Sequence, residues 1–294
     1  MREVKIMTDI KVAAIQMSCS RDVKENIDKA EKMVREAASK GAKIILLPEL
    51  FERQYFCQER RYDYYEYAKP VAENDAVLRL TEVSRELSVV LPVSIYERDK
   101  TTLYNTVVML DCGENLGIYR KTHIPDDHFY QEKFYFTPGN TGFKVFETTY
   151  GRVGVGICWD QWFPETARSL ALLGADIILY PTAIGSEPIL GMDSSGHWQR
   201  TMQGHSAANI IPVVAANRIG HEEVKPCEEN SFQESSLDFY GTSFLTNETG
   251  EVIEQADKIS ENILYAEYDF DNLKKVRLEW GMFRDRRPEM YDLI

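Results

Sequence analysis

Three side chains that together suit acyl transfer occupy similar places in this 294-residue sequence. Glu49, Lys121 and Cys158 each come at the end of a short run that is rich in β-branched or other apolar residues. A thiol can be a nucleophile, a carboxylate can act as general base, and an ammonium can stabilise the charge of a tetrahedral intermediate. Because open α/β sheets bind ligands beyond the carboxyl ends of their strands, we expect the three groups to converge on one crevice.

Cys158 lies where a predicted strand turns into a predicted helix. The alternating run 152–157 precedes it. Pro164 suits the first turn of the next helix, and the negative charge of Glu165 suits the positive, N-terminal end of that helix. Such a turn exposes a side chain at the sheet edge, where backbone N–H groups can stabilise a thiolate or an oxyanion. A lone cysteine at a strand end is also commonly a small buried hydrophobe, so this segment alone leaves both interpretations open.

Glu49 and Lys121 also have ordinary structural explanations. Glu49 follows an apolar strand and faces Leu50 and Phe51, and apolar surroundings raise the pKa of a carboxyl group toward the range that suits a general base. The alternative is a helix-capping or surface glutamate. Lys121 ends the second arm of a predicted hairpin, where a lysine is usually a solvated charge. The combination of the three residues, rather than any one of them, predicts a catalytic site.

The elements that must position these residues are short β-rich runs alternating with amphipathic stretches. The predicted helices span residues 23–40, 75–87, 164–173 and 196–209. The predicted strands span residues 10–17, 43–47, 89–96, 106–110, 116–120, 143–147, 152–157, 176–180, 211–217, 240–246 and 264–268. This alternation predicts an α/β fold with mixed strand directions.

The chain is predicted to form one domain over residues 1–294, with its core at about 10–270. No linker rich in Gly, Pro or Ser, no heptad and no internal repeat divides it. The acidic segment 221–238 is predicted to be a long surface loop. The segment 271–294 is predicted to dock on the body or on a neighbouring subunit, because its last part, 281–294, has too few apolar residues to fold alone.

Composition excludes several classes of protein. With 44% hydrophobic and 28% charged residues the chain is globular, and no apolar run approaches the roughly 20 residues that span a bilayer. The net charge of −13 argues against nucleic acid as a partner. The N-terminus lacks the apolar stretch of a secretion signal, which favours a cytoplasmic location. The five widely spaced cysteines indicate neither a disulfide framework nor a metal knuckle.

Three separated motifs resemble the nitrilase superfamily, the carbon–nitrogen hydrolases. They are Leu47-Pro48-Glu49, residues 119–125 (YRKTHIP) and residues 156–160 (GICWD), with further similarity at 132–139 and 180–185. The similarity runs from about Lys11 to Glu289. It implies a four-layer α-β-β-α sandwich, a covalent thioester-type intermediate, no metal or organic cofactor, and assembly into dimers or larger oligomers.

The resemblance also assigns roles to residues of this chain. Glu49 is expected to be the general base, Lys121 the group that stabilises the tetrahedral intermediate, and Cys158 the nucleophile. Glu132 is expected to position Lys121 or the substrate amide; the alternative is a surface acid paired with Lys133.

Residues 186–188, 193–200 and 202–205 are similar to the branch of the family that cleaves carbamoylated amines. The implied partner is therefore a small-molecule substrate whose far end is an ammonium, and burying that cation requires carboxylates or aromatic rings. The candidate substrate-binding residues share a place in or next to the matched motifs: His123, His128, Tyr130, Trp159, Glu187 and Asp193. No compact ligand pattern such as HExxH joins the histidines, so no metal site is expected.

Several rival functions remain. A carbamoyl amino acid hydrolase or an ω-amidase needs a cation for a substrate carboxylate, which Arg200 or Arg218 could supply. A nitrilase is a third rival within hydrolysis. A glutamine-amidase module needs a nucleotide-binding partner domain, and the sequence contains no P-loop. A catalytically silent scaffold on the same fold is disfavoured by the intact Glu49, Lys121 and Cys158.

Overall fold

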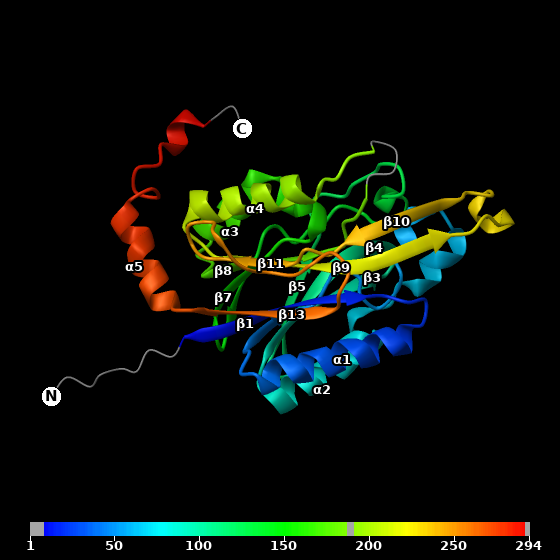
Figure 1. Cartoon of the computed structure of the whole chain (residues 1–294), viewed down its shortest axis with the longest axis horizontal. Helices are drawn as coiled ribbons and strands as arrows, with labels where there is room; N and C mark the ends of the chain where they lie inside the picture. Colours follow the sequence, from blue (N-terminus) through cyan, green and yellow to red (C-terminus); the bar gives the residue numbers. More distant parts are fainter. Residues whose placement is uncertain (1–8, 187–190, 292–294) are drawn as a thin grey trace.

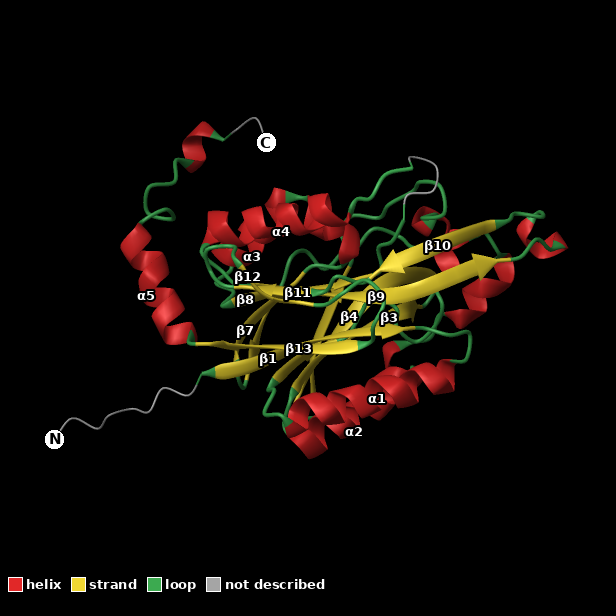
Figure 2. Cartoon of the chain, viewed as in Figure 1, coloured by secondary structure: helices red, strands yellow, loops and turns green. Residues whose placement is uncertain are grey.

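The strands form one mixed sheet that folds back on itself so that its two halves face each other (Figures 1 and 2). A computed structural model describes residues 9–186 and 191–291. Within them the main strand order is β5-β4-β3-β2-β1-β9-β8-β7-β6. The halves are joined where the end of β1 pairs with β9, through Met17–Arg218 and Ser18–Ile219.

Each half of the sheet combines a parallel centre with antiparallel edges. The first half contains β1 (Ile10–Ser18), β2 (Ile44–Leu46), β3 (Val90–Asp99), β4 (Thr102–Asp111), β5 (Glu114–Arg120) and β13 (Asn262–Tyr268). The second half contains β6 (Val145–Thr148), β7 (Gly151–Val155), β8 (Ile177–Thr182), β9 (Val213–Val224), β10 (Ser235–Tyr240), β11 (Phe244–Thr246) and β12 (Val252–Gln255).

Helices cover the outer face of each half. The α-helices are α1 (Val23–Ser39), α2 (Asp75–Leu87), α3 (Pro164–Leu172), α4 (Ser195–Asn209) and α5 (Phe270–Trp280). Short 3₁₀ helices are η1 (Phe56–Gln58), η2 (Tyr62–Tyr67), η3 (Val71–Glu73), η4 (Glu132–Phe134), η5 (Cys158–Trp162), η6 (Glu228–Asn230) and η7 (Pro288–Met290). The α1–α2 pair lies against the first half and the α3–α4 pair against the second (Figure 2).

Three apolar clusters hold these layers together. One lies between the two sheet halves and contains Val12 and Ile44 from the first half and Val155 and Leu179 from the second. A second packs the first half against α1 and α2, and a third packs the second half against α3 and α4. The expected four-layer α-β-β-α sandwich is confirmed, because both faces of each half bury apolar side chains.

The topology brings the ends of the relevant strands to one edge. β1, β2 and β3 are parallel, and β5 runs in the same direction because two antiparallel pairings separate it from β3. β7, β8 and β9 are parallel to one another, and β9 is parallel to β1. The carboxyl ends of β2, β5 and β7, which precede Glu49, Lys121 and Cys158, therefore point toward the same side of the molecule.

The predicted surface loop at 221–238 is only partly correct, because both of its ends belong to an antiparallel ribbon and only residues 225–234 connect the two strands. β9 continues to Val224 and pairs with β10, with Ser236 opposite Glu223 and Asp238 opposite His221. The polar composition misled the prediction because this ribbon projects from the body (Figure 1) and needs few apolar side chains. The predicted strand 240–246 is also divided, since Gly241 and Thr242 both have positive φ and end β10 before β11 begins.

Two further elements were not predicted at their full extent. The strands at 89–96 and 106–110 extend into a hairpin with a turn at Lys100, because buried Glu97 and Asn105 find polar partners within the fold. The segment 270–280, for which no helix was predicted, forms helix α5.

Helix α5 begins on the body of the protein and then leaves it (Figure 1). Phe270 and Leu273 are buried in the central cluster, and Arg277 donates hydrogen bonds to the carbonyls of Ala175 and Ile210. Trp280, at its end, is 66% exposed. None of the helices in the described ranges is both long and apolar enough to cross a membrane.

Candidate active site

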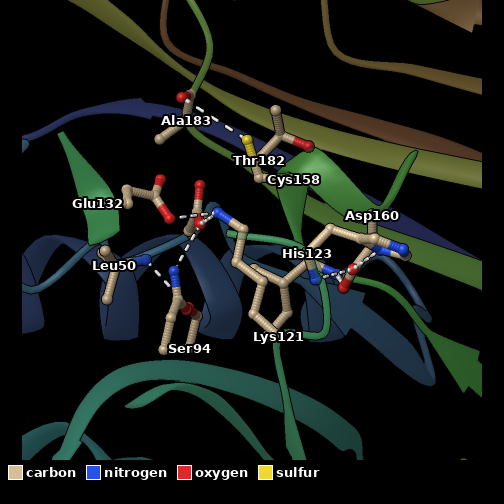
Figure 3. A network of polar contacts seen from close by, with 12 residues as sticks. Leu50, Ser94, Lys121, His123, Glu132, Cys158, Asp160, Thr182 and Ala183 are labelled. Atoms are coloured by element: carbon tan, nitrogen blue, oxygen red, sulfur yellow. Dashed lines mark hydrogen bonds and ion pairs between the residues drawn. The ribbon is translucent and has the colours of Figure 1, made fainter. Parts of the chain in front are cut away.

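A buried cluster of three ionisable side chains lies at the shared strand edge (Figure 3). Lys121 Nζ donates to Glu49 Oε1 at 2.8 Å and to Glu132 Oε2 at 2.7 Å. All three side chains are at most 1% exposed. One ammonium thus lies between two carboxylates, and the ionised cluster carries one excess negative charge. Burial alone would lower the pKa of Lys121, but the charges of Glu132 and Glu49 outweigh it and raise that pKa well above its usual range.

Backbone contacts hold the Glu49 end of the cluster in place. The N–H of Glu49 donates to the carbonyl of Thr182, which links the end of β2 to the end of β8 in the other half of the sheet. The buried guanidinium of Arg218 donates to the carbonyls of Glu49 at 2.8 Å and Leu50 at 3.0 Å. Leu50 has φ of 48°, a conformation that these bonds help to maintain.

Asn105 is a further polar contact of this cluster that the sequence analysis missed. Its Nδ2 donates to Glu49 Oε1 at 2.7 Å, and its carbonyl accepts from the N–H of Lys121. Its strand was predicted to begin one residue later, at Thr106, so no signal marked it. With two donors on Oε1, Glu49 Oε2 is buried without a hydrogen-bond partner among the described residues. That oxygen is free to accept a proton from a nucleophile or from water.

Cys158 sits in a strained turn at the end of β7, as the first residue of η5. Its φ is 42°, which is costly for a residue with a Cβ and fixes the direction of the side chain. Its Sγ lies 3.8 Å from the carbonyl of Ala183. Burial, and next the negative charge of Glu49, raise the pKa of the thiol well above its usual range. The resting sulfur is therefore a thiol, and its attack on a carbonyl requires a base.

Glu132 is fully buried, which excludes the alternative of a surface acid paired with Lys133. It lies in η4 and accepts a hydrogen bond from the hydroxyl of Tyr55 at 2.7 Å as well as the one from Lys121. Tyr55 is a second contact that the sequence analysis missed. Burial raises the pKa of Glu132 to about 7, although the charge of Lys121 opposes the shift.

This pKa gives an expected pH dependence. We expect kcat/KM to fall as the pH is lowered through about 7, because protonation of Glu132 removes half of the negative charge that holds Lys121. Glu132→Gln should remove this acidic limb and lower kcat/KM at pH 8 by about 100-fold, an effect typical of a group assisting proton transfer. A full pH–rate profile of both proteins measures this; an unchanged limb in the variant would assign it to another group.

The same variant tests stability with a defined sign. Between pH 4.5 and 7 the native protein keeps the proton on Glu132 while the unfolded chain releases it, so the native state binds more protons and loses stability as the pH rises. In Glu132→Gln this dependence on pH is absent, because the amide does not titrate. We therefore expect the difference in melting temperature, variant minus unsubstituted protein, to be larger at pH 8 than at pH 5.

The structure separates the predicted substrate-binding residues into two groups. Trp159, 37% exposed, lies next to Cys158. Tyr130 is mostly buried; its ring centroid lies 5.7 Å from that of Tyr55, and its hydroxyl accepts from the N–H of Gly185 at 2.9 Å. Trp159 is thus next to the nucleophile, and Tyr130 packs on Tyr55, which bonds to Glu132. His123 is partly exposed, and its Nδ1 lies 2.7 Å from Asp160 Oδ1.

The other predicted binding residues lie farther out or outside the description. His128 is exposed, pairs with Asp127, and lines a surface cavity of about 350 Å³ with Arg60 and Gln233. Asp193 is exposed and forms an ion pair with Lys258 at 2.7 Å, which holds the pKa of its carboxyl at about 2. Glu187 lies outside the described residues.

The two arginines considered for a substrate carboxylate differ in availability. Arg218 is fully buried and is bound to backbone carbonyls and, at 2.9 Å, to Glu222. It is a structural residue rather than a ligand. Arg200 lies on the exposed side of α4. Within residues 9–186 and 191–291, no cluster of three or more histidine, cysteine or acidic side chains is arranged to hold a metal ion.

Comparison with known proteins agrees with this geometry. The model of the carbon–nitrogen hydrolase family matches residues 11–278. The chain is 51% identical over 288 residues to an N-carbamoylputrescine amidase of Arabidopsis thaliana, covering 97% of this chain and 95% of that protein. It is 50% identical over 290 residues to a citrullinase of Francisella tularensis, covering 98% and 99%. A solved carbon–nitrogen hydrolase from Helicobacter pylori has a TM-score of 0.87 at 34% identity, with 97% of each chain covered.

Proposed function

The chain belongs to the carbon–nitrogen hydrolase family, and we propose that it cleaves N-carbamoylputrescine to putrescine, carbon dioxide and ammonia. The observation that carries the chemistry is the buried Lys121, which is held between Glu49 and Glu132. The Cys158 thiol lies near enough for the charges of these three residues to shift its pKa. The support for the substrate is the identity of about 50% over nearly the full length to plant proteins of that activity.

The first half-reaction forms a covalent intermediate. Cys158 Sγ bonds to the ureido carbonyl carbon while its proton passes to the unpartnered Oε2 of Glu49. The bond to the terminal nitrogen then breaks, and Glu49 returns the proton so that ammonia leaves. Cys158 now carries the carbonyl group and the diamine as a thiocarbamate.

The second half-reaction releases the diamine. Water attacks the thiocarbamate carbonyl while Glu49 takes a proton from it, and the proton is returned to the sulfur as the C–S bond breaks. The released carbamate decomposes to carbon dioxide and putrescine. No metal or organic cofactor takes part in this scheme.

Both tetrahedral intermediates carry an oxyanion. We assign its stabilisation to Lys121 and to the N–H of Trp159. Trp159 is the second residue of η5, and the first N–H groups of a helix have no intrahelical acceptor. Preorganised donors of this kind contribute about 3–4 kcal/mol each to lowering a barrier. An unactivated urea is a poor electrophile and needs this contribution.

Recognition of the ammonium end is assigned to Trp159, Tyr130 and Glu187. We expect Glu187→Gln to raise KM for N-carbamoylputrescine by about 10- to 100-fold, the usual cost of a lost charge-assisted hydrogen bond. Asp193→Asn is the matched control, because that carboxylate already binds Lys258. Its KM should stay within about twofold, given that exposed ion pairs contribute little. Equal KM values in both variants and in the unsubstituted protein would place the ammonium elsewhere.

A second candidate substrate is citrulline, because the 50% identical citrullinase is as similar as the plant amidases. Citrulline carries a carboxylate beside its ammonium. Arg218, the buried candidate for binding such a carboxylate, is committed to backbone carbonyls and Glu222. This commitment favours the simple diamine, and leaves a carbamoyl amino acid or an ω-amide as the less supported alternatives.

The direct experiment is ammonia release from three substrates in parallel. N-carbamoylputrescine, citrulline and N-carbamoyl-β-alanine would be compared at equal concentration, with Cys158→Ala as the blank. We expect kcat/KM for the first to exceed that for the others by at least 100-fold. Preference for citrulline would transfer the assignment to the second candidate, and preference for N-carbamoyl-β-alanine would contradict the proposed ammonium pocket.

We propose that the protein acts in the cytoplasm, in polyamine synthesis from agmatine, as a dimer or larger oligomer. The five unpaired cysteines support the cytoplasmic location, and the exposed Leu278 and Trp280 on α5 support assembly into an oligomer. Light scattering of the purified protein measures the number of subunits.

A further inference from the structure

A fully buried carboxylate, Asp160, lies in the same turn as Cys158 and beside His123, which follows the strand end that carries Lys121 (Figure 3). It accepts four hydrogen bonds. Oδ2 accepts from the hydroxyl of Tyr119 at 2.7 Å and from the N–H of Ile157 at 2.9 Å. Oδ1 lies 2.9 Å from the N–H of His123 and 2.7 Å from its ring Nδ1.

The partners of Asp160 flank the catalytic candidates on both sides. Tyr119 and His123 stand two residues before and two residues after Lys121, and Ile157 is the residue before Cys158. Three of the four bonds, those from Tyr119 and His123, therefore join the first half of the sheet to the second at the reaction centre, and the fourth, from Ile157, is local. The two joined segments are β5 with the residues that follow it and η5. No strand pairing connects these two segments.

Local packing holds Asp160 rigidly in this place. Its own N–H donates to the carbonyl of Ile157, and its carbonyl accepts from the N–H of Phe163. The ring of Phe163 stacks on the ring of His123, with centroids 3.7 Å apart and planes 7° apart. The side chain of Asp160 thus closes the first turn of η5 through the N–H of Ile157. Trp159, the second residue of η5, lies within that turn.

A carboxylate is the side chain that this arrangement requires. Its two oxygens accept all four bonds, whereas an asparagine would offer one oxygen and an NH₂ that faces donors. A buried charge must be stabilised by donors, and here neutral groups and a histidine ring provide them. None of these contacts reaches the substrate site directly, so Asp160 acts through the residues that it holds.

We propose that Asp160 is a positioning residue that fixes the Lys121 ammonium relative to the Cys158 sulfur and aims the Trp159 N–H at the oxyanion. This role rests on the proposed functions of those three residues. A displacement of about 1 Å at a reaction centre costs on the order of 100-fold in rate, so the geometry held by Asp160 has a measurable effect.

The test compares two buried aspartates. We expect Asp160→Asn to lower kcat by about 100-fold while KM stays within about threefold, because ground-state binding does not depend on this alignment. Asp176→Asn is the matched control: Asp176 is also buried, and it accepts from the N–H of Arg152 and pairs with the Arg152 guanidinium, away from the site. It should lose stability and keep kcat. Equal kcat in the two variants would overturn the proposal.

Two milder variants keep the test decisive if Asp160→Asn does not fold. Tyr119→Phe and His123→Phe each remove one of the four bonds and retain an aromatic ring. We expect kcat to fall by about three- to tenfold in each, at saturating substrate and at a temperature where each protein is fully folded, since each lost bond displaces the site only partly. Loss of melting temperature with unchanged kcat in both would show a merely structural role.

The reaction of Cys158 with iodoacetamide separates this proposal from the choice of substrate. If the unsubstituted protein hydrolyses none of the carbamoyl compounds, the substrate proposal fails while the alkylation rate still tests Asp160. We expect that rate to fall at least fivefold in Asp160→Asn and to stay unchanged in Asp176→Asn, because thiol activation by Glu49 depends on the same alignment. Equal rates in all three proteins would contradict the positioning role.

Discussion

Cys158→Ala is expected to lower kcat by at least about 10⁵-fold, comparable to removing the nucleophile of other covalent hydrolases. The reason is geometric as well as chemical. The strained φ of 42° at Cys158 directs Sγ at the end of β7, and alanine leaves no group at that place to form the covalent intermediate. Ammonia release measured at saturating N-carbamoylputrescine gives the ratio.

The control is a second cysteine, which is more accessible than Cys158 and lies away from the site. Cys112→Ser changes a thiol in the turn between β4 and β5 that lies 3.9 Å from the Thr149 hydroxyl. It should leave kcat unchanged. Iodoacetamide should inactivate this control as fast as the unsubstituted protein. Residual turnover of Cys158→Ala above 1% would refute Cys158 as the nucleophile.

Mass spectrometry of the acid-quenched enzyme tests the order of release. If ammonia leaves first, the adduct on Cys158 contains the carbonyl group and the whole diamine. An adduct that contains only a carbamoyl group would reverse the proposed order, since the diamine would then have left before hydrolysis. Glu49→Gln should increase the amount trapped if Glu49 activates the water.

Lys121→Met has the second largest expected effect, because it acts on both rate and stability. We expect kcat/KM to fall by about 10³-fold or more through loss of an oxyanion donor. We also expect destabilisation of about 3–5 kcal/mol, the usual cost of removing one partner from a buried ion pair. Glu49 and Glu132 would be left facing each other in a site that is 0–1% exposed.

A double variant distinguishes the two effects of Lys121. Lys121→Met combined with Glu132→Gln removes one of the two unpaired negative charges and should recover at least half of the lost stability in urea unfolding. Its activity should stay as low as that of the single variant. Recovery of activity along with stability would mean that Lys121 matters only for folding, which would exclude it as the oxyanion donor.

The parts of the fold that apolar periodicity describes were predictable. The helix at 75–87 and the strands at 10–17 and 116–120 lie within two residues of their predicted bounds, because each has one face or both faces in the core. Polar elements were not predictable in this way. The ends of β3 and β4 carry Glu97 and Asn105, and the ribbon of β9 and β10 carries many polar residues, so no local pattern distinguished them from loops.

The same distinction applies to the site. Glu49, Lys121 and Cys158 were identified because each ends a strand and belongs to a recognisable motif. Asn105 and Tyr55 belong to no such motif, and Asp160 stood inside a quoted motif without an assigned role. Asp193 was a candidate for substrate binding until the structure showed Lys258, 65 residues away, bound to its carboxylate.

The sequence by itself determined the residue types, their order and their places at strand ends, because those depend on local patterns of burial and turn. Only the tertiary structure decided that one ammonium lies between two carboxylates, that Glu49 keeps one oxygen unpaired, and that Asp160 joins the two halves of the sheet. These facts depend on contacts between residues 11 to 72 positions apart. Such contacts arise only when the strand edges meet, and hydrogen-bond chemistry then selects among the side chains that are brought within 3 Å of one another.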